Sequence, residues 1–169
     1  MNTVRKLPVG IQDFEKLRKE NCLYVDKTQY VYQLAQTVSP YFLARPRRFG
    51  KSLFLSTLKA YFEGKKELFE GLKIAGLEKE WTEYPVIYLD FNVGLLTSAT
   101  NVAERLSVKI KELENLWGKK TDTGDLASRF EAVIESAYEQ TGKKAVVLID
   151  EYDKPLISTM EDETANNEI

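Results

Sequence analysis

The stretch RPRRFGKSL, residues 45–53, combines the residue types that hold the phosphate groups of a nucleotide. Gly50 lets the backbone approach a phosphate closely, Lys51 supplies a mobile cation, and the Ser52 hydroxyl is a ligand for Mg²⁺. Arginine side chains suit contacts with phosphate oxygens. The residues that we expect to contact the nucleotide are Arg45, Arg47, Arg48, Phe49, Gly50, Lys51, Ser52 and Leu53.

This stretch departs from the usual phosphate-binding loop (Walker A), because Arg45 stands where that loop has its first glycine. The first glycine mainly serves the turn out of a strand, and Pro46 offers a different rigid turn. A second interpretation is a glycine before a helix, with Ser52 as an ordinary first-turn residue. Arg47 and Arg48 have alternatives of their own: they bind phosphate, bind a neighbouring polypeptide or stay solvated.

A second stretch, VVLIDE, delivers two carboxylates at the end of an apolar run. In many P-loop ATPases this Walker B pattern provides an aspartate that holds Mg²⁺ and a glutamate that polarises a water molecule. We therefore expect Asp150 and Ser52 to bind the metal and Glu151 to be the catalytic base. The alternative is a strand end that carries solvated acids. Asp90 is a weaker candidate for a supporting role, with helix capping or solvation as its alternatives.

Short apolar runs and helical stripes predict the elements that position these residues. Strands are expected at Tyr41–Ala44, 86–92 and 145–149, with a short β-like stretch at CLYVD. Apolar residues at helical spacing predict helices over 11–17, from about Thr28 to Val38 with Asp26 or Thr28 as the cap, and over 54–62, 102–117 and 126–137.

Strands that alternate with helices predict an α/β protein, a three-layer sandwich of the P-loop NTPase type with a mostly parallel sheet. Both chemical stretches follow expected strands, and ligands of such sheets collect at the carboxyl ends of the strands. No linker or repeat divides the chain, so we expect a single domain over residues 1–169. Residues 1–38 would form an N-terminal segment and residues 39–169 the nucleotide-binding core.

Composition excludes several classes of chemistry. The 169 residues contain no histidine, which rules out imidazole bases and histidine-ligated metals within this sequence. Cys22 is the one cysteine, and we interpret it as a small buried residue. The net charge of −2 gives no general argument for nucleic-acid binding. No apolar run is long enough to span a bilayer, so the cytoplasm is the expected compartment.

Three blocks together resemble the bacterial and archaeal AAA-ATPase-like family: LPVGIQDFEKLRKENCLYVDKT, YFLARPRRFGKSLFLSTL and VVLIDEYDKPL. The resemblance implies that Arg45 is a family variant of the phosphate loop. It also implies an additional-strand P-loop fold, ATP as the nucleotide, and Gly50, Lys51, Ser52, Asp150 and Glu151 as motif residues. Members typically continue into a PD-(D/E)XK nuclease-like domain.

The sequence therefore predicts Mg²⁺-dependent ATP binding, with hydrolysis in the full-length protein. The alternative is a non-hydrolysing, nucleotide-sensing module that regulates the attached nuclease-like domain or a protein partner. In the fold that the resemblance implies, the strand between Tyr41–Ala44 and 145–149 comes from sequence that follows Glu151. We therefore expect the sheet to be incomplete at the C-terminal end, and the isolated chain to be marginally stable.

Overall fold

This computed structural model describes residues 5–46, 48–91, 99–118 and 124–152. The chain divides into two compact units, residues 1–83 and 84–169, and each unit is described by itself. The expectation of a single domain, with a core that begins at residue 39, stays a prediction.

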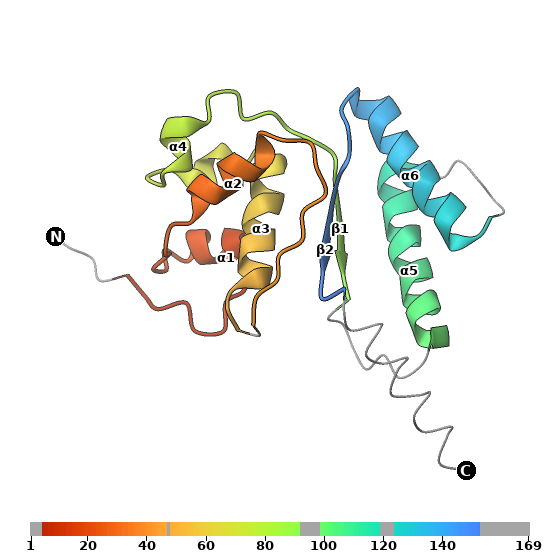
Figure 1. Cartoon of the computed structure of the whole chain (residues 1–169), viewed down its shortest axis with the longest axis horizontal. Coiled ribbons are helices and arrows are strands. Elements are labelled where there is room, and N and C mark those ends of the chain that lie inside the picture. The colour runs from red at the N-terminus through yellow and green to blue at the C-terminus, as the bar shows by residue number, and fades with distance from the viewer. Residues whose placement is uncertain (1–4, 47, 92–98, 119–123, 153–169) are drawn as a thin grey trace, which may run out of the picture. The chain divides into compact units, whose positions relative to one another are not determined.

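The first unit is helical in its described part (Figure 1). Its longest helix, α3, begins directly after the phosphate-loop stretch, and the other helices are shorter. The elements in chain order are α1 (Phe14–Lys19), α2 (Thr28–Ala35), α3 (Lys51–Phe62), the 3-10 helix η1 (Lys66–Phe69) and α4 (Ile74–Leu77).

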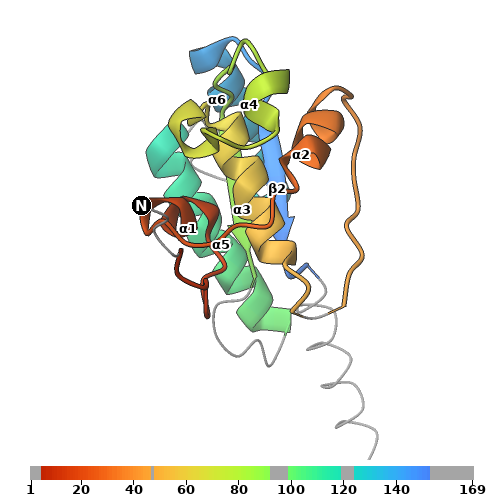
Figure 2. The same ribbon diagram turned by 90° about the vertical axis from the view of Figure 1, so that its left-hand side faces the viewer.

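An aromatic cluster forms the core of this unit. Phe14 of α1 is fully buried, with its ring centroid 4.9 Å from that of Phe69 and 5.1 Å from that of Tyr24. Tyr61 of α3 packs edge-on against Phe69, at 6.4 Å. The same helices lie side by side in Figure 2, where α1 and α2 flank α3. The aromatic cluster therefore fixes α3, the helix that follows residues 45–50, against the N-terminal segment.

Asp26 connects two helices of the first unit. Its carboxylate accepts hydrogen bonds from the Thr28 backbone N–H at 2.9 Å and from the Lys73 backbone N–H at 2.7 Å. The Thr28 hydroxyl in turn accepts from the backbone N–H of Ile74 at 3.1 Å. Partial burial raises the pKa of Asp26, but the hydrogen bonds from the Thr28 hydroxyl, at 2.6 Å, and from the Lys73 and Thr28 backbone N–H groups outweigh it and lower the pKa. The N-cap of α2 is Lys27, with no side-chain cap bond, so neither Asp26 nor Thr28 occupies the predicted cap position, although Asp26 accepts from the first N–H of the helix.

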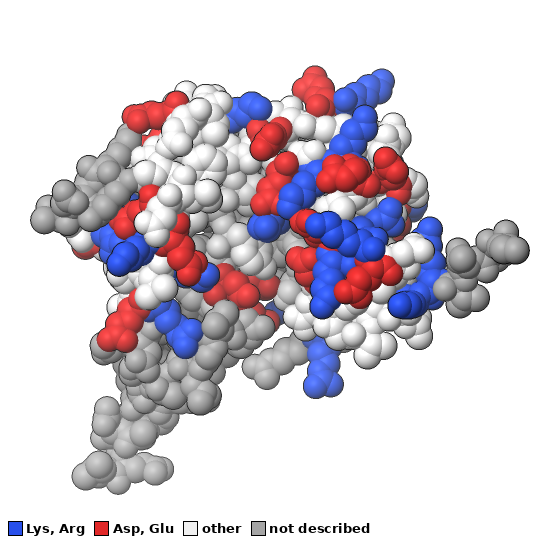
Figure 3. All heavy atoms as spheres, turned by 180° about the vertical axis from the view of Figure 1, so that it is seen from behind, with Lys and Arg blue, Asp and Glu red and all other residues white. Residues whose placement is uncertain are grey.

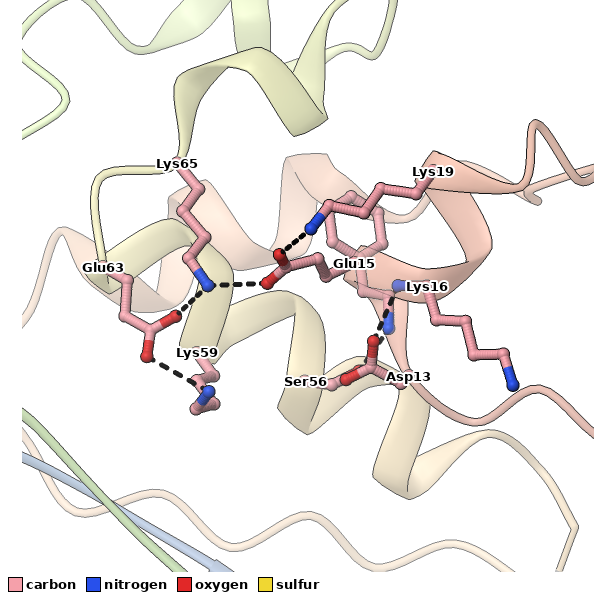
Figure 4. A network of polar contacts seen from close by, with 9 residues as sticks. Asp13, Glu15, Lys16, Lys19, Ser56, Lys59, Glu63 and Lys65 are labelled. Carbon is pink, nitrogen blue, oxygen red and sulfur yellow. Dashed lines mark hydrogen bonds and ion pairs between the residues drawn. The ribbon is translucent and has the colours of Figure 1, made fainter.

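Ion pairs join α1 to the end of α3 (Figure 4). Glu15 accepts from Lys19 and from Lys65, each at 2.6 Å. Lys65 also contacts Glu63 at 2.9 Å, and Glu63 contacts Lys59 at 3.1 Å. The hydrogen bonds from Lys19 and Lys65 lower the pKa of Glu15 to about 2.

This lowered pKa predicts an acid-dependent contribution of Glu15 to stability. The ionised carboxylate stabilises the fold above its ordinary pKa of 4.5, and the contribution is lost as the pH falls toward about 2. Because the pair is partly exposed, we expect Glu15→Gln to cost at most about 1 kcal/mol at neutral pH. Urea unfolding of both proteins between pH 7 and pH 2 measures this. A cost that stays constant or grows on acidification would contradict the assignment.

The second unit contains a parallel two-stranded sheet in its described part (Figure 1). Its elements are β1 (Val86–Asp90), α5 (Ala99–Trp117), α6 (Leu126–Thr141) and β2 (Val146–Asp150). The register pairs Val86 with Val146 and Asp90 with Asp150. The two strands therefore end together, which places both aspartates at one edge of the sheet.

Helices α5 and α6 cover one face of this sheet. Ile87 and Leu89 of β1 pack with Leu113 of α5 and Val133 of α6, and all four are buried. Such parallel connections through helices bury apolar strands, which is why the apolar runs in the sequence predicted them. The Asp125 side chain caps α6 by accepting from the Ser128 backbone N–H at 2.8 Å.

The α/β class and the parallel sheet are confirmed, whereas the strand predicted at Tyr41–Ala44 is wrong. These residues have no strand conformation in the structure, and Phe42 is 68% exposed. A strand forms only against a hydrogen-bonded neighbour, and no described segment pairs with this one. The three-layer sandwich, which needs more strands than the described residues provide, stays a prediction.

Smaller differences occur at element ends. Helix α2 ends at Ala35, so Val38, expected on its apolar face, lies outside it and is 92% exposed. Ile11 precedes α1, which begins at Phe14 behind its Asp13 cap. The β-like stretch CLYVD forms only one isolated bridge, between Cys22 and Lys6. The prediction that Cys22 is buried is confirmed.

Candidate functional site

The loop before α3 has a backbone conformation suited to binding an anion. Arg48 has φ 67° and Gly50 has φ 74°, so two residues at alternate positions are left-handed. The Phe49 backbone N–H donates to the Pro46 carbonyl at 3.4 Å, which closes a turn. Left-handed residues next to right-handed ones turn successive N–H groups toward a common point, where an anion can accept them.

Glycine suits position 50 because of its backbone conformation and not because a side chain would lack room. No atom lies within 4 Å of the place where a side-chain Cβ would be, so its positive φ is what favours glycine. Arg48 adopts the same region with a side chain, at a cost of about 1–2 kcal/mol. Strained backbone of this kind gathers at ligand-binding loops. The structure thus gives Gly50 a backbone conformation that a residue with a side chain would adopt only under strain.

The first turn of α3 presents backbone donors to this loop. The Gly50 carbonyl accepts from the Phe54 N–H at 3.0 Å, and no side chain caps the helix. The N–H groups of Lys51, Ser52 and Leu53 come before the first intrahelical donor, the Phe54 N–H, and so have no acceptor within the helix. Together with the helix dipole they give this end a partial positive charge that favours an anionic ligand.

The predicted nucleotide-contacting residues are accessible. Arg45, Arg48, Phe49 and Gly50 are exposed, with Phe49 at 64%, while the next three residues, Lys51, Ser52 and Leu53, are half-buried. Arg47 lies outside the described residues. The side chains of this loop are therefore open to a ligand rather than being used in the core.

Ser56 anchors the start of α3 to the N-terminal segment. Its hydroxyl oxygen accepts from the Phe14 backbone N–H at 2.9 Å, and its proton reaches the Leu53 carbonyl at 2.9 Å or the Gln12 carbonyl at 3.3 Å. Ser56 is 8% exposed and lies one turn beyond Ser52. This contact ties the phosphate-loop helix to the residues just before α1.

Ser56→Ala is expected to lower the free energy of unfolding by about 1–2 kcal/mol, because it leaves the buried Phe14 N–H without an acceptor. Chemical denaturation of both proteins measures this. Thr37→Ala, which removes an exposed hydroxyl bonded to Tyr41, is the matched control and should cost less. Equal costs for the two variants would show that the Ser56 contact adds nothing specific.

The second candidate group lies at the carboxyl end of β2. Asp150 is 6% exposed, and its Oδ1 atom accepts from the Glu151 backbone N–H at 3.0 Å. Its Oδ2 atom accepts from the Tyr88 hydroxyl, on β1, at 3.3 Å. Glu151 follows with φ 53°, in the left-handed region, and is half-buried. The chain therefore turns sharply after the strand, as at functional strand ends.

Asp90 lies where a supporting role for Asp150 becomes possible. That role requires the strand of Asp90 to lie beside the strand of Asp150, and β1 and β2 are paired in register at these two residues. Two carboxylates at one strand edge favour a cation there. Its helix-capping alternative falls on residues 92–98, which lie outside the described part.

The two groups of predicted site residues belong to different units of the structure. Ser52 belongs to the first unit and Asp150 to the second, so their joint binding of Mg²⁺ stays a prediction. Within the described residues, no group of three or more acidic or cysteine side chains forms a ready-made metal site.

Sequence reasoning missed Ser56 and Tyr88 as neighbours of the candidate residues. Ser56 is part of the helical block SLFLSTL, where a serine gives no signal of a long-range contact. Tyr88 lies in an apolar strand run, where a tyrosine is the expected residue type. Both roles depend on tertiary pairing: docking of residues 12–14 on α3, and the register of β1 against β2.

Charge on the surface is mixed. On the face shown in Figure 3, basic and acidic side chains are interleaved over the described residues. This pattern agrees with the near-neutral total and does not favour a nucleic-acid surface on that face. Among the helices that the structure describes, none has the length and apolar character required to cross a membrane.

Comparisons with known proteins agree with the motifs. The model of the family described as "Predicted AAA-ATPase" matches residues 8–169. An uncharacterized protein in the vnfD 5' region of Azotobacter chroococcum mcd 1 is 38% identical over 158 residues, which cover 92% of this chain and 30% of the relative. This chain thus spans about a third of that protein's length. No solved structure matches. The match of the family model over residues 8–169 shows that the chain belongs to the predicted AAA-ATPase family.

Proposed function

We propose that the chain is the ATP-binding part of a Mg²⁺-dependent P-loop ATPase. The observation that carries the proposal is the loop at the start of α3, where left-handed Arg48 and Gly50 precede first-turn N–H groups and Lys51. This combination of backbone donors, helix dipole and cation suits a polyphosphate better than a single carboxylate. Membership of the family supports nucleotide use.

Each candidate residue has a distinct role in this proposal. The loop amides and Lys51 hold the phosphates, and Arg45, Arg47 and Arg48 add positive charge around them. The Ser52 hydroxyl and the Asp150 carboxylate are oxygen ligands of the kind that Mg²⁺ takes, so the donor set fits the metal. When bound, the metal would neutralise charge on the phosphates during transfer.

Glu151 is proposed as the base for hydrolysis. It follows Asp150 directly, and its backbone is in the left-handed region, with φ 53°. A carboxylate at this place would accept a proton from the water that attacks the terminal phosphate, yielding ADP and inorganic phosphate. We propose ATP hydrolysis for the full-length protein, because the matched region covers only 30% of the length of the relative.

We also propose that nucleotide binding is coupled to a second domain. The resemblance implies a nuclease-like domain after the ATPase region, and we propose that nucleotide binding controls such a domain. The expected cytoplasmic location belongs to the same proposal.

Calorimetric titration with ATP and with a non-hydrolysable analogue, each with and without Mg²⁺, tests the function when it is combined with an assay of phosphate release. Binding of both nucleotides that strengthens with Mg²⁺ is expected. Binding without phosphate release, in this chain and in the full-length protein, would favour the nucleotide sensor over the ATPase. Absence of binding under all conditions would contradict the proposal.

A further inference from the structure

Tyr88 is placed by the sheet register against the candidate metal ligand. Because Asp90 pairs with Asp150 in the parallel sheet, Tyr88, two residues before Asp90, lies diagonally across from Asp150. Residues two apart on a strand share a face, so the tyrosine and the aspartate lie on the same side of the sheet. The Tyr88 hydroxyl donates to Asp150 Oδ2 at 3.3 Å.

The Asp150 carboxylate is held at both oxygens. Oδ2 accepts from Tyr88 on the neighbouring strand, and Oδ1 accepts from the next backbone N–H, that of Glu151, at 3.0 Å. A carboxylate offers about four acceptor sites, so lone pairs remain for a cation after these two bonds. The two donors therefore fix the plane of the carboxylate without using up its capacity to bind a metal.

We propose that Tyr88 is a positioning residue: its hydroxyl holds Asp150 in the orientation in which the carboxylate binds the Mg²⁺ of Mg·ATP. This inference rests on the proposed function and assigns a residue beyond the two motifs. Partners of metal-binding carboxylates commonly act in this way, by setting the orientation of the ligand. The hydroxyl does not contact nucleotide in this assignment and acts only through Asp150.

Tyr88→Phe tests the inference, because it removes the hydroxyl and keeps the ring. The affinity for a non-hydrolysable ATP analogue is measured over a series of Mg²⁺ concentrations and in EDTA. We expect unchanged affinity in EDTA and a rise of about 10-fold in the Mg²⁺ concentration needed for half of the metal-dependent gain. Tyr138→Phe, at an exposed position of α6, is the matched control and should behave as the wild type.

A double-mutant cycle separates positioning from a purely structural role. If Tyr88 acts through Asp150, adding Tyr88→Phe to Asp150→Asn should cause no further change in the Mg²⁺ dependence. Additive losses in the cycle would overturn the inference, as would Mg²⁺ curves of wild type and Tyr88→Phe that coincide. A Tyr88→Phe protein that no longer melts cooperatively would also overturn it, because the hydroxyl would then serve folding. Failure of the wild type to bind the analogue at all would overturn the proposed function together with this inference.

Discussion

Lys51→Ala is expected to weaken binding of ATP by about 10- to 100-fold, because hydrogen bonds from a charged group contribute about 1.5–3 kcal/mol. Lys51 is the first residue of α3, and its half-buried side chain lies outside the aromatic core of the first unit. The substitution should therefore leave the fold intact. Titration calorimetry with Mg·ATP measures the change in affinity.

A matched variant shows whether the loss is specific. Lys79→Ala removes the same side chain from an exposed position of the first unit, far along the sequence from the loop. Its affinity should equal that of the wild type, and both variants should melt at the wild-type temperature. If Lys51→Ala binds ATP as tightly as Lys79→Ala, the loop at the start of α3 does not hold phosphate.

Glu151→Gln should retain ATP while slowing its hydrolysis by about 100-fold or more, the usual effect of removing a positioned base. Glutamine has nearly the same size and keeps hydrogen-bonding capacity, and the Glu151 backbone N–H can still donate to Asp150. Phosphate release in single-turnover experiments on the full-length protein separates the catalytic step from binding.

Glu131→Gln is the control for the change of charge, because Glu131 is an exposed residue of α6 in the same unit. Its rate should match that of the wild type. Equal rates for Glu151→Gln and the wild type would remove Glu151 from the mechanism. If the wild-type protein binds ATP without releasing phosphate, Glu151 has no catalytic role, and the nucleotide-sensing alternative is favoured.

The helices that the sequence predicted well are those with a long apolar stripe. In α5 the residues Leu106, Ile110 and Leu113 repeat at helical spacing, and the helix, predicted over 102–117, spans Ala99–Trp117. The short pieces η1 and α4 were not predicted. They span only a few residues each, too few for a periodic pattern, and they are held by tertiary contacts such as the bond from Ile74 to Thr28.

The run Tyr41–Ala44 shows the opposite limit of sequence reasoning. Aromatic and apolar residues favour a strand there by composition, but a strand also needs a neighbour to accept and donate its backbone hydrogen bonds. The run Val146–Asp150 has the same character and is a strand because β1 pairs with it residue by residue. The presence of a paired neighbouring strand therefore determines which of these two similar runs forms a strand.

For the candidate site, the residue types were predictable and their supports were not. Gly50 was expected directly before a helix, and α3 begins at the next residue, Lys51. The contacts of Ser56 with residues 12–14 and of Tyr88 with Asp150 join segments far apart in the sequence. A single sequence carries no signal for contacts between such distant segments.

The most direct measurement of the central claim is the amide ¹H–¹⁵N NMR spectrum of the chain, recorded during titration with a non-hydrolysable ATP analogue and Mg²⁺. If the phosphates bind at the start of α3, the amide protons of Gly50, Lys51 and Ser52 should move downfield with the largest shifts in the spectrum. Those shifts should saturate together with binding and disappear in Lys51→Ala. Saturable binding that leaves these three amides in place and moves others would contradict the account.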